Sequence, residues 1–343
     1  ILGIKDFVNT SDDFYMQSPH GMAVLSIMGG YLPGQLVGTA PKAGYLLVRT
    51  ENTGSEYSAE EDSWISGAEV ADSCGADIIN SSLGYTDFDD PATSHTYSDM
   101  DGNTTRVTRA ADIAASKGMI VVNSAGNSGD DAWHYIGAPA DADSILAVGA
   151  VDDYSKIAPF SSRGPSSNER IKPDVCAKGV STVFASYYGG IDQGNGTSFS
   201  SPVIAGLTAC LWQAAPELSN MEIIALIKKY ASKSNNPDND YGYGLPNYAQ
   251  AFIEVTKYNV PNIDEQNTVS LSPNPFNSKL EVKFFSNQST NIEIEIYDIS
   301  GRLVSKRSNL LVFEGYNNIQ LSDVDALSQG MYILQIVTEH AKI

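Results

Sequence analysis

Short apolar runs alternate with helical patterns over the first two thirds of the chain, and this alternation constrains the fold more than any other feature. Four runs have the length of buried strands: residues 45–48, 76–79, 119–122 and 145–148. Strands that alternate with helices usually pair in parallel and are covered by helices. The sequence therefore predicts an α/β fold for this part, a parallel sheet flanked by helices.

Four helices are predicted around these strands, at residues 60–73, 105–117, 198–215 and 219–230. The first has its apolar residues on one face, at helical spacing: Trp64, Ile65, Ala68 and Ala71. Gly118 follows the second and is typical of a helix end, because glycine adopts the left-handed conformation that closes many helices.

The last part of the chain has a different pattern. Polar and apolar residues alternate in residues 279–285 and 291–297, and a further apolar run covers residues 331–337. Half-buried strands joined by turns predict a small antiparallel β-sandwich. The polar stretch before it lacks periodicity, so we expect three parts: a first domain at 1–258, a linker at 259–267 and a second domain at 268–343.

The charge balance limits the partners. The chain has 21 Lys and Arg against 41 Asp and Glu, a formal charge of −20, and the first 266 residues hold 15 of the former and 33 of the latter. Nucleic acids and anionic membranes need a basic surface, so neither is expected as a partner. No apolar run is long enough to span a bilayer.

The three cysteines, Cys74, Cys176 and Cys210, are far apart and odd in number. A disulfide framework is therefore not expected, although one oxidised pair stays open. We expect all three to be small buried hydrophobic residues.

Residues 195–206 are the segment that most strongly indicates catalytic chemistry. Within it, two small residues precede Ser198 and a predicted apolar helix follows. A serine at a helix N-terminus lies beside unpaired backbone N–H groups that can hold an oxyanion. The alternative is that Ser198 only caps the helix, which is a common role for serine.

His20 and Asn127 supply the other two groups that such a serine would need. A serine is a weak nucleophile without a base, and His20 stands directly before an apolar helical stretch. The remaining histidines, His95, His134 and His340, lie in polar or terminal contexts and are expected at the surface. Asn127 follows a predicted buried strand, where its amide could donate to an oxyanion or could simply form an Asn turn.

Together these segments resemble the subtilisin-like serine peptidases, the subtilases, over about residues 18–255. The matching motifs are H-G-x-x-V at His20, S-S-L-G-Y at Ser81, A-G-N at Asn127 and G-T-S-x-x-S-P at Ser198. The resemblance implies Ser198 as nucleophile, His20 as general base and Asn127 as oxyanion donor. It also implies a substrate cleft lined by Ser82, Leu83, Gly84, Ser124, Ala125 and Gly126, with Gly137 at the floor of the first specificity pocket.

Two positions depart from the pattern of this family. Met22 stands where threonine is usual, and no aspartate in the expected strand context precedes His20. Asp6 follows a short apolar run but lacks the small residue and glycine that should come next, and Asp12 and Asp13 fall in a polar loop. We expect the triad aspartate upstream of Ile1, so that this chain is an impaired fragment of an active peptidase. The alternative is a catalytically inactive surface binding protein on the same fold.

The chemistry implied by the resemblance requires no cofactor. Many subtilases bind calcium, so a calcium site is compatible with this chain, but no motif identifies its ligands. The acidic residues 51–61 could suggest a glycoside hydrolase pair. We favour instead a helix start, where Glu60, Glu61 and Asp62 complement the helix dipole.

The last 76 residues resemble the C-terminal sorting domain of the type IX secretion system. The motifs are L-S-P-N-P-F at Leu271, I-Y-D-I-S-G-R-L-V at Ile296 and L-S-Q-G-M-Y-I at Leu327. This resemblance implies the type IX secretion machinery as a partner and a secreted or cell-surface location, and the resemblance to the subtilases implies protein or peptide substrates. An ordinary carbohydrate-binding or fibronectin-like sandwich is the alternative. The brief tail at 340–343 suggests a clipped C-terminus.

Overall fold

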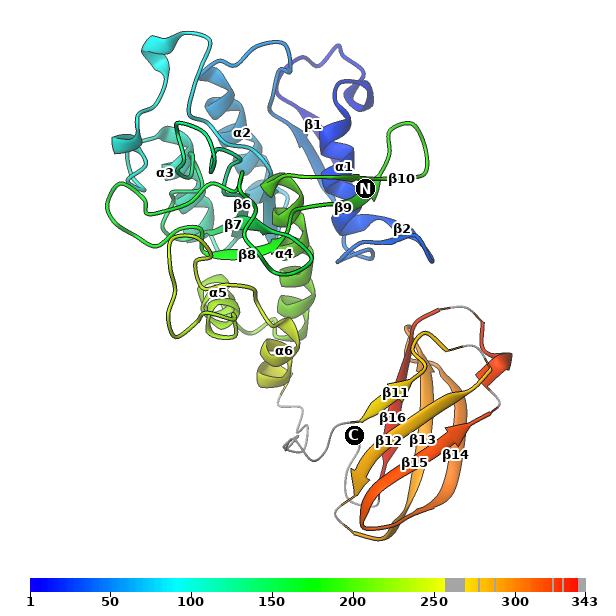
Figure 1. Cartoon of the computed structure of the whole chain (residues 1–343). Coiled ribbons are helices and arrows are strands. Elements are labelled where there is room, and N and C mark those ends of the chain that lie inside the picture. The colour runs from blue at the N-terminus through cyan, green and yellow to red at the C-terminus, as the bar shows by residue number, and fades with distance from the viewer. Residues whose placement is uncertain (257–268, 277, 287, 323, 329, 339–343) are drawn as a thin grey trace. The chain divides into compact units, whose positions relative to one another are not determined.

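The predicted parallel sheet is present, with four strands in chain order (Figure 1). These strands are β5 (Ile78–Ser81), β6 (Ile120–Ser124), β7 (Leu146–Val151) and β8 (Val175–Lys178). All three neighbouring pairs are parallel. The α/β prediction for this part is therefore confirmed.

The computed structural model describes residues 1–256, 269–276, 278–286, 288–322, 324–328 and 330–338. It divides into two units, Ile1–Thr256 and Lys257–Ile343. The predicted linker and the tail at 340–343 lie outside the described residues, so the proposed domain bounds stay predictions.

Helices cover both faces of the four-stranded sheet. On one face lie α2 (Ala59–Ser73) and α3 (Arg106–Ser116), and on the other lie α4 (Thr197–Ala214), α5 (Asn220–Lys229) and α6 (Tyr248–Thr256). Strand β6 shows the arrangement directly, because Val121 packs in the α2–α3 core whereas Ile120 and Val122 pack in the core of α4 and α5. The period of two along a strand thus divides its side chains between two cores.

A second, two-stranded parallel sheet lies in the first unit, formed by β1 (Gly3–Asp6) and β4 (Leu46–Arg49). Helix α2 reaches both sheets: its Gly67 lies against Val48 of β4, and its Trp64 Nε1 donates to Ser81 Oγ of β5 at 3.0 Å. Among the described residues no backbone hydrogen bond joins β4 to β5. In the part of the chain that the structure describes, strand β4 pairs only with β1 and strand β5 only with β6, so each has one unpaired edge near α2. The side chains of β4 are only half-buried, whereas β6 and β7 are fully buried.

Two β-hairpins each contribute a strand that packs against helix α1 (Pro19–Gly29). They are the hairpins β2 (Tyr31–Leu32) with β3 (Leu36–Val37) and β9 (Thr182–Ala185) with β10 (Ile191–Gly194). Helix α1 packs against α4, β9 and β3. This packing sets the N-terminal region beside the helix that begins near Ser198.

The second unit is a sandwich of two antiparallel three-stranded sheets, as predicted (Figure 1). One sheet has the order β11 (Ser270–Ser272), β12 (Leu280–Ser286), β15 (Gly315–Leu321), and the other β14 (Leu303–Val312), β13 (Thr290–Asp298), β16 (Tyr332–Val337). Residues at period two, such as Ile292, Ile294 and Ile296, face its separate core.

The prediction of three buried cysteines is wrong for two of them. Cys176 is buried on β8, but Cys74 and Cys210 are exposed, and all three are free thiols. Cys74 follows directly after the last turn of α2, where the chain turns at the surface. Within the described part of the chain, the helices are too short or too polar for a membrane span.

Candidate functional site

Ser198 is the second residue of α4, close to the carboxyl end of β5. The helix is capped by Gly196 without a side-chain bond, so the alternative that Ser198 serves as the cap is wrong. The Ser198 hydroxyl donates to the Ser82 carbonyl at 3.4 Å, and the Ser82 hydroxyl donates to the Ser198 carbonyl at 2.9 Å. This reciprocal pair ties the start of α4 to the loop after β5, and Ser198 remains only half-buried.

Asn127 lies in the loop after β6 and faces the same helix start. Its Oδ1 accepts from the Thr197 backbone N–H at 2.9 Å and from the Thr197 hydroxyl at 3.0 Å. Both contacts use the oxygen, so the Nδ2 group is the end of this exposed amide that can donate to a ligand.

Gly126 allows this loop to turn before Asn127. Its φ is +109°, and a Cβ there would lie 2.7 Å from the hydroxyl of Ser162. A larger residue would be strained and would clash, so glycine is required at this position.

The residues expected to line the substrate cleft differ in their exposure to solvent. Leu83 is half-buried and Gly84 exposed, whereas Ser124 and Ala125 are buried. Gly137 is also buried, and a Cβ there would lie 3.0 Å from the Thr86 methyl group.

His20 is the second residue of α1, and its backbone N–H donates to the Ser18 side chain at 3.3 Å. The residue as a whole is exposed, but the surrounding chain desolvates its imidazole enough to lower the pKa of His20. The ring lies 6.3 Å from that of Phe199, the residue after Ser198. Among the described hydrogen bonds none joins His20 to Ser198, so the two are near neighbours through Phe199 rather than bonded partners.

Asp6 is the last residue of β1, and its carboxylate forms an ion pair with Arg49. Its carboxylate lies 3.0 Å from Arg49 Nη1, which also binds Asp12 at 2.9 Å. Burial acts to raise the pKa of Asp6, but hydrogen bonds from the backbone of Val8 and Asn9 and the Arg49 guanidinium lower it overall. Asp6 is therefore an ion-pair residue of the β1–β4 sheet, and no described contact links it to His20.

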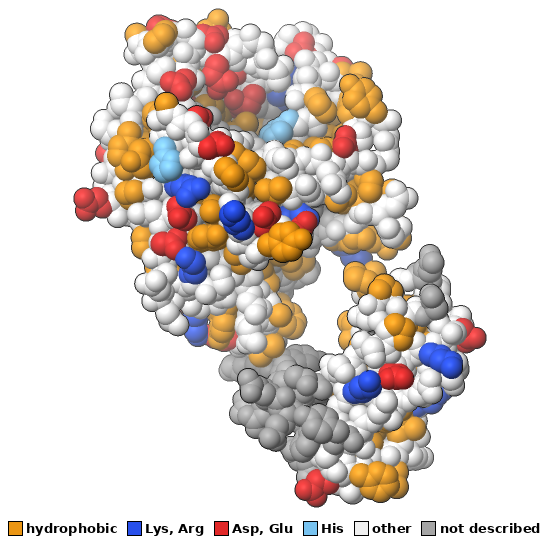
Figure 2. All heavy atoms as spheres, viewed as in Figure 1, with side chains coloured by type: hydrophobic (Ala, Val, Ile, Leu, Met, Phe, Trp, Pro, Cys, Tyr) orange, Lys and Arg blue, Asp and Glu red, His pale blue; other side chains and the backbone are white. Residues whose placement is uncertain are grey.

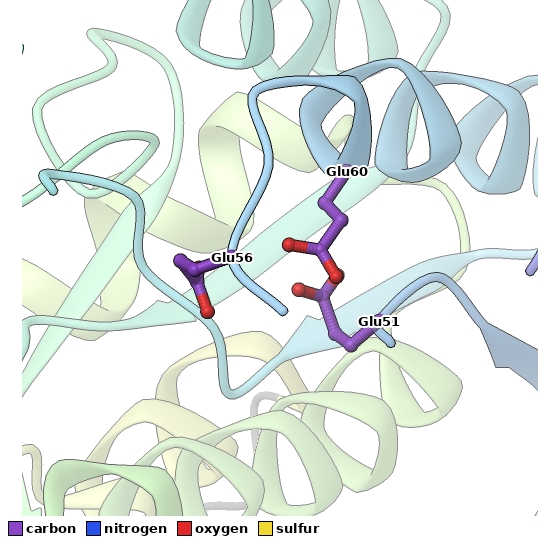
Figure 3. A group of neighbouring side chains, drawn as sticks. All are labelled: Glu51, Glu56 and Glu60. Atoms are coloured by element: carbon purple, nitrogen blue, oxygen red, sulfur yellow. The ribbon is translucent and has the colours of Figure 1, made fainter. Parts of the chain in front are cut away.

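Three carboxylates meet where β4 runs toward α2: Glu51, Glu56 and Glu60 (Figure 3). Their oxygens lie within 4.8 Å of one another, which is close enough to hold a divalent cation. Figure 2 shows acidic side chains gathered around a hollow on this face of the first unit. Burial and repulsion from Glu60, Glu51 and Asp89 raise the pKa of Glu56 to about 7.

Hydrogen bonds already account for two of these carboxylates. Glu51 accepts from the hydroxyls of Thr50 and Tyr85, both at 2.7 Å, and Glu60 accepts from the backbone N–H groups of Asn52 and Tyr57. The last two contacts hold the loop at the start of α2, as expected for acids in a first helical turn.

Phe184 and Phe199 are site neighbours that the sequence reasoning missed. Their rings stack at 4.9 Å, and Phe199 also faces His20. Phe199 could have been identified as a neighbour of the site because it directly follows Ser198 in the sequence, whereas no sequence pattern identifies Phe184.

Comparison with known proteins gives a consistent result for both units. Residues 4–244 match the model of the subtilase family, and residues 270–343 match that of a secretion system C-terminal sorting domain. The serine protease AprX of Bacillus subtilis (strain 168) is 31% identical over 277 residues, 72% of this chain and 60% of that protein.

A thermophilic serine proteinase of Bacillus sp. (strain AK1) is 32% identical over 249 residues, 71% of this chain. The chain spans 60% and 54% of the lengths of these two relatives. In structure, the prenylagaramide maturation protease PagA matches with a TM-score of 0.59 at 22% identity, over 74% of this chain and 92% of that one. The structural likeness supports the fold alone.

Proposed function

Because the chain belongs to the subtilase family of serine proteases, we propose that its first unit hydrolyses peptide bonds in proteins or peptides. The proposed nucleophile is Ser198, the general base is His20 and the oxyanion donor is Asn127. The observation that carries this assignment is that Ser198, Asn127 and His20 all lie at the first turn of α4 or in contact with it.

The proposed mechanism follows from this arrangement. His20 takes the proton of Ser198 as Oγ attacks the substrate carbonyl, and later returns it to the leaving amine. The carbonyl oxygen becomes an oxyanion, which the Asn127 amide and the Ser198 backbone N–H stabilise. Since Asn127 uses its Oδ1 for Thr197, its Nδ2 group is the end of the amide that would donate to the oxyanion.

We further propose that the acid of the triad comes from a strand that these 343 residues do not contain. Two observations support this. Asp6 and Asp12 are bound to Arg49, and among the described residues nothing pairs with one edge of β4 or one edge of β5, both near α2. The acid would fix the imidazole tautomer and stabilise the imidazolium, and its loss costs roughly 10⁴-fold in turnover in the well-studied triads.

A fluorophosphonate serine probe tests these assignments, with Ser198→Ala as the control that removes the nucleophile. We expect slow labelling that the control abolishes, and fast labelling once the chain is extended by the acid-bearing strand. Fast labelling of the 343-residue chain would refute the missing acid. Labelling that survives in the control would refute Ser198 as nucleophile.

The absence of a described carboxylate at His20 also favours a second candidate, an inactive binding protein on the subtilase fold. The sequence encoded upstream of Ile1 separates the two. An apolar run that ends in Asp, then Ser, Thr or Ala, then Gly favours the enzyme, and its absence favours the binder.

The second unit is a secretion sorting domain, and the protein is accordingly secreted or held at the cell surface. We propose that the exporting machinery is the type IX system, on the motifs at Leu271, Ile296 and Leu327. Deletion of residues 268–343 should abolish appearance of the protein in the culture medium. Unchanged export would refute the sorting role.

The proposed chemistry needs no cofactor, and we propose calcium only as a structural ion without assigned ligands. Addition of calcium should then raise the melting temperature, because a ligand that binds the folded state stabilises it. An unchanged melting temperature at millimolar calcium would argue against any such site.

A further inference from the structure

Nothing polar in the described residues holds the imidazole of His20 in one orientation. Its side chain makes no described hydrogen bond, and its backbone N–H is bonded to Ser18. Helix α1 packs against α4, β9 and β3, and these three elements contain no Asp, Glu, Lys, Arg or His. Their one titratable side chain, the Cys210 thiol, donates to the Thr39 carbonyl at 3.4 Å. Tyr45 lies near Gly29 at the far end of α1, and its hydroxyl donates to the Ala40 carbonyl at 2.7 Å.

An aromatic pair contacts this imidazole instead. The Phe199 ring lies 6.3 Å from the His20 ring at 46°, within the range of aromatic contacts. Its neighbour Phe184, on β9, stacks on Phe199 at 4.9 Å and 25°. Because β9 itself packs against α1, the pair is held between the helix of the base and the helix of the nucleophile.

Gly194 makes room for the pair. A Cβ at this position would lie 2.7 Å from the Phe199 ring and 2.8 Å from the Phe184 ring. Gly194 ends β10, just before the turn that leads into α4, so an added side chain would push both rings away from their present places.

We propose that the Phe184–Phe199 pair positions the imidazole of His20 beside Ser198, which makes both phenylalanines positioning residues of the site. The proposal rests on the function proposed above. A base must keep one nitrogen within hydrogen-bond reach of the hydroxyl, and a misplacement of 1 Å can cost about 10²-fold in rate. Packing against a fixed ring restricts the imidazole where hydrogen bonds do not.

The test is a pH titration of the histidine NMR signals in the 343-residue chain, assigned to His20 with a His20→Gln variant. Partial burial lowers the pKa of His20. In Phe199→Leu we expect that pKa to rise toward its ordinary value near 6.5, because water reaches the ring. Gly194→Ala should shift it in the same direction by displacing the pair, and Phe199→Tyr should preserve it because the ring remains.

Phe88→Leu is the matched control, because Phe88 contacts a different histidine, His95, at 5.4 Å. It should leave the His20 titration unchanged. An unchanged His20 titration in both Phe199→Leu and Gly194→Ala would overturn the proposal.

A second measurement keeps this proposal apart from the function itself. The rate of fluorophosphonate labelling at Ser198 should fall about tenfold or more in Phe199→Leu and be retained in Phe199→Tyr. A wild-type chain that does not label at all contradicts the proposed function, and the NMR titration then still decides whether the aromatic pair positions His20.

Discussion

In the proposed mechanism the two ends of the Asn127 amide have different roles, since Oδ1 binds Thr197 and Nδ2 donates to the oxyanion. This can be tested by changing one atom. In Asn127→Asp the Oδ1 contacts to Thr197 are retained, but the NH₂ donor becomes a carboxylate oxygen. We expect labelling or turnover to fall by at least about 10²–10³-fold, the cost of removing one such donor, which was itself measured in a subtilisin.

The measurement is the labelling rate alongside the melting temperature. Asn103→Asp, a change at an exposed surface asparagine, is the control and should affect neither. A full rate in Asn127→Asp would exclude the amide as oxyanion donor.

Glu56 makes the stability of the first unit depend on pH. Its pKa is raised to about 7 in the folded chain, so the folded state holds the proton more tightly than the unfolded state does. Stability from this group is therefore present below pH 4.5 and is lost as the pH rises through about 7. We expect Glu56→Gln to raise the melting temperature at pH 8 by about 2 °C or more and to leave it unchanged at pH 4.

Glu69→Gln, on the exposed face of α2, serves as the control and should behave like wild type at both pH values. Equal melting temperatures of wild type and Glu56→Gln across this pH range would contradict the prediction.

At the level of elements, a buried charge cluster joins β8 to its surroundings. Asp174, directly before β8, binds Lys172 at 2.9 Å and Lys228 of α5 at 2.7 Å, and its Oδ2 accepts from the Ala147 backbone at 2.8 Å. Burial acts to raise the pKa of Asp174, but the two ammonium groups lower it overall. The carboxylate is therefore charged and fully paired.

Removal of that charge leaves the Lys172 ammonium buried without its partner. We expect Asp174→Asn to lower the free energy of unfolding by about 3–5 kcal/mol, measured by chemical denaturation. Glu254→Gln, which breaks an exposed pair with Lys229, should cost less than about 1 kcal/mol. Similar losses in both variants would show that burial of the Asp174 pair does not matter.

The elements themselves were largely predictable, because their signals are local. The capping box of Ser219 with Glu222, and Gly118 after α3, mark helix ends that depend only on nearby residues. The candidate site could be proposed from motifs, since Ser198, His20 and Asn127 each follow or begin a regular element.

The contacts between distant segments could not be predicted in this way. The reciprocal bonds of Ser82 with Ser198 join residues 116 positions apart, and the packing of Phe184 on Phe199 depends on how β9 lies against α4. Such contacts follow from tertiary packing, which no local pattern encodes. The ion pair of Asp6 with Arg49 depends likewise on the pairing of β1 with β4.

At the scale of the whole molecule, each unit has its own hydrophobic core. We expect calorimetry of the full chain to show two unfolding transitions, because separate cores unfold as separate cooperative units. A chain that ends at Thr256 should keep the first transition within about 2 °C. A single transition, or a larger shift on truncation, would contradict this expectation.

The unpaired edges of β4 and β5 near α2 have one further consequence. A strand edge is a template for another extended chain, and under the missing-acid proposal a peptide that paired with both edges would also supply the triad carboxylate. Such a peptide would be at once a ligand and the last catalytic group, so its concentration would set the catalytic output. The domain would then behave as a split enzyme, whose activity reports how much of the peptide is bound to it.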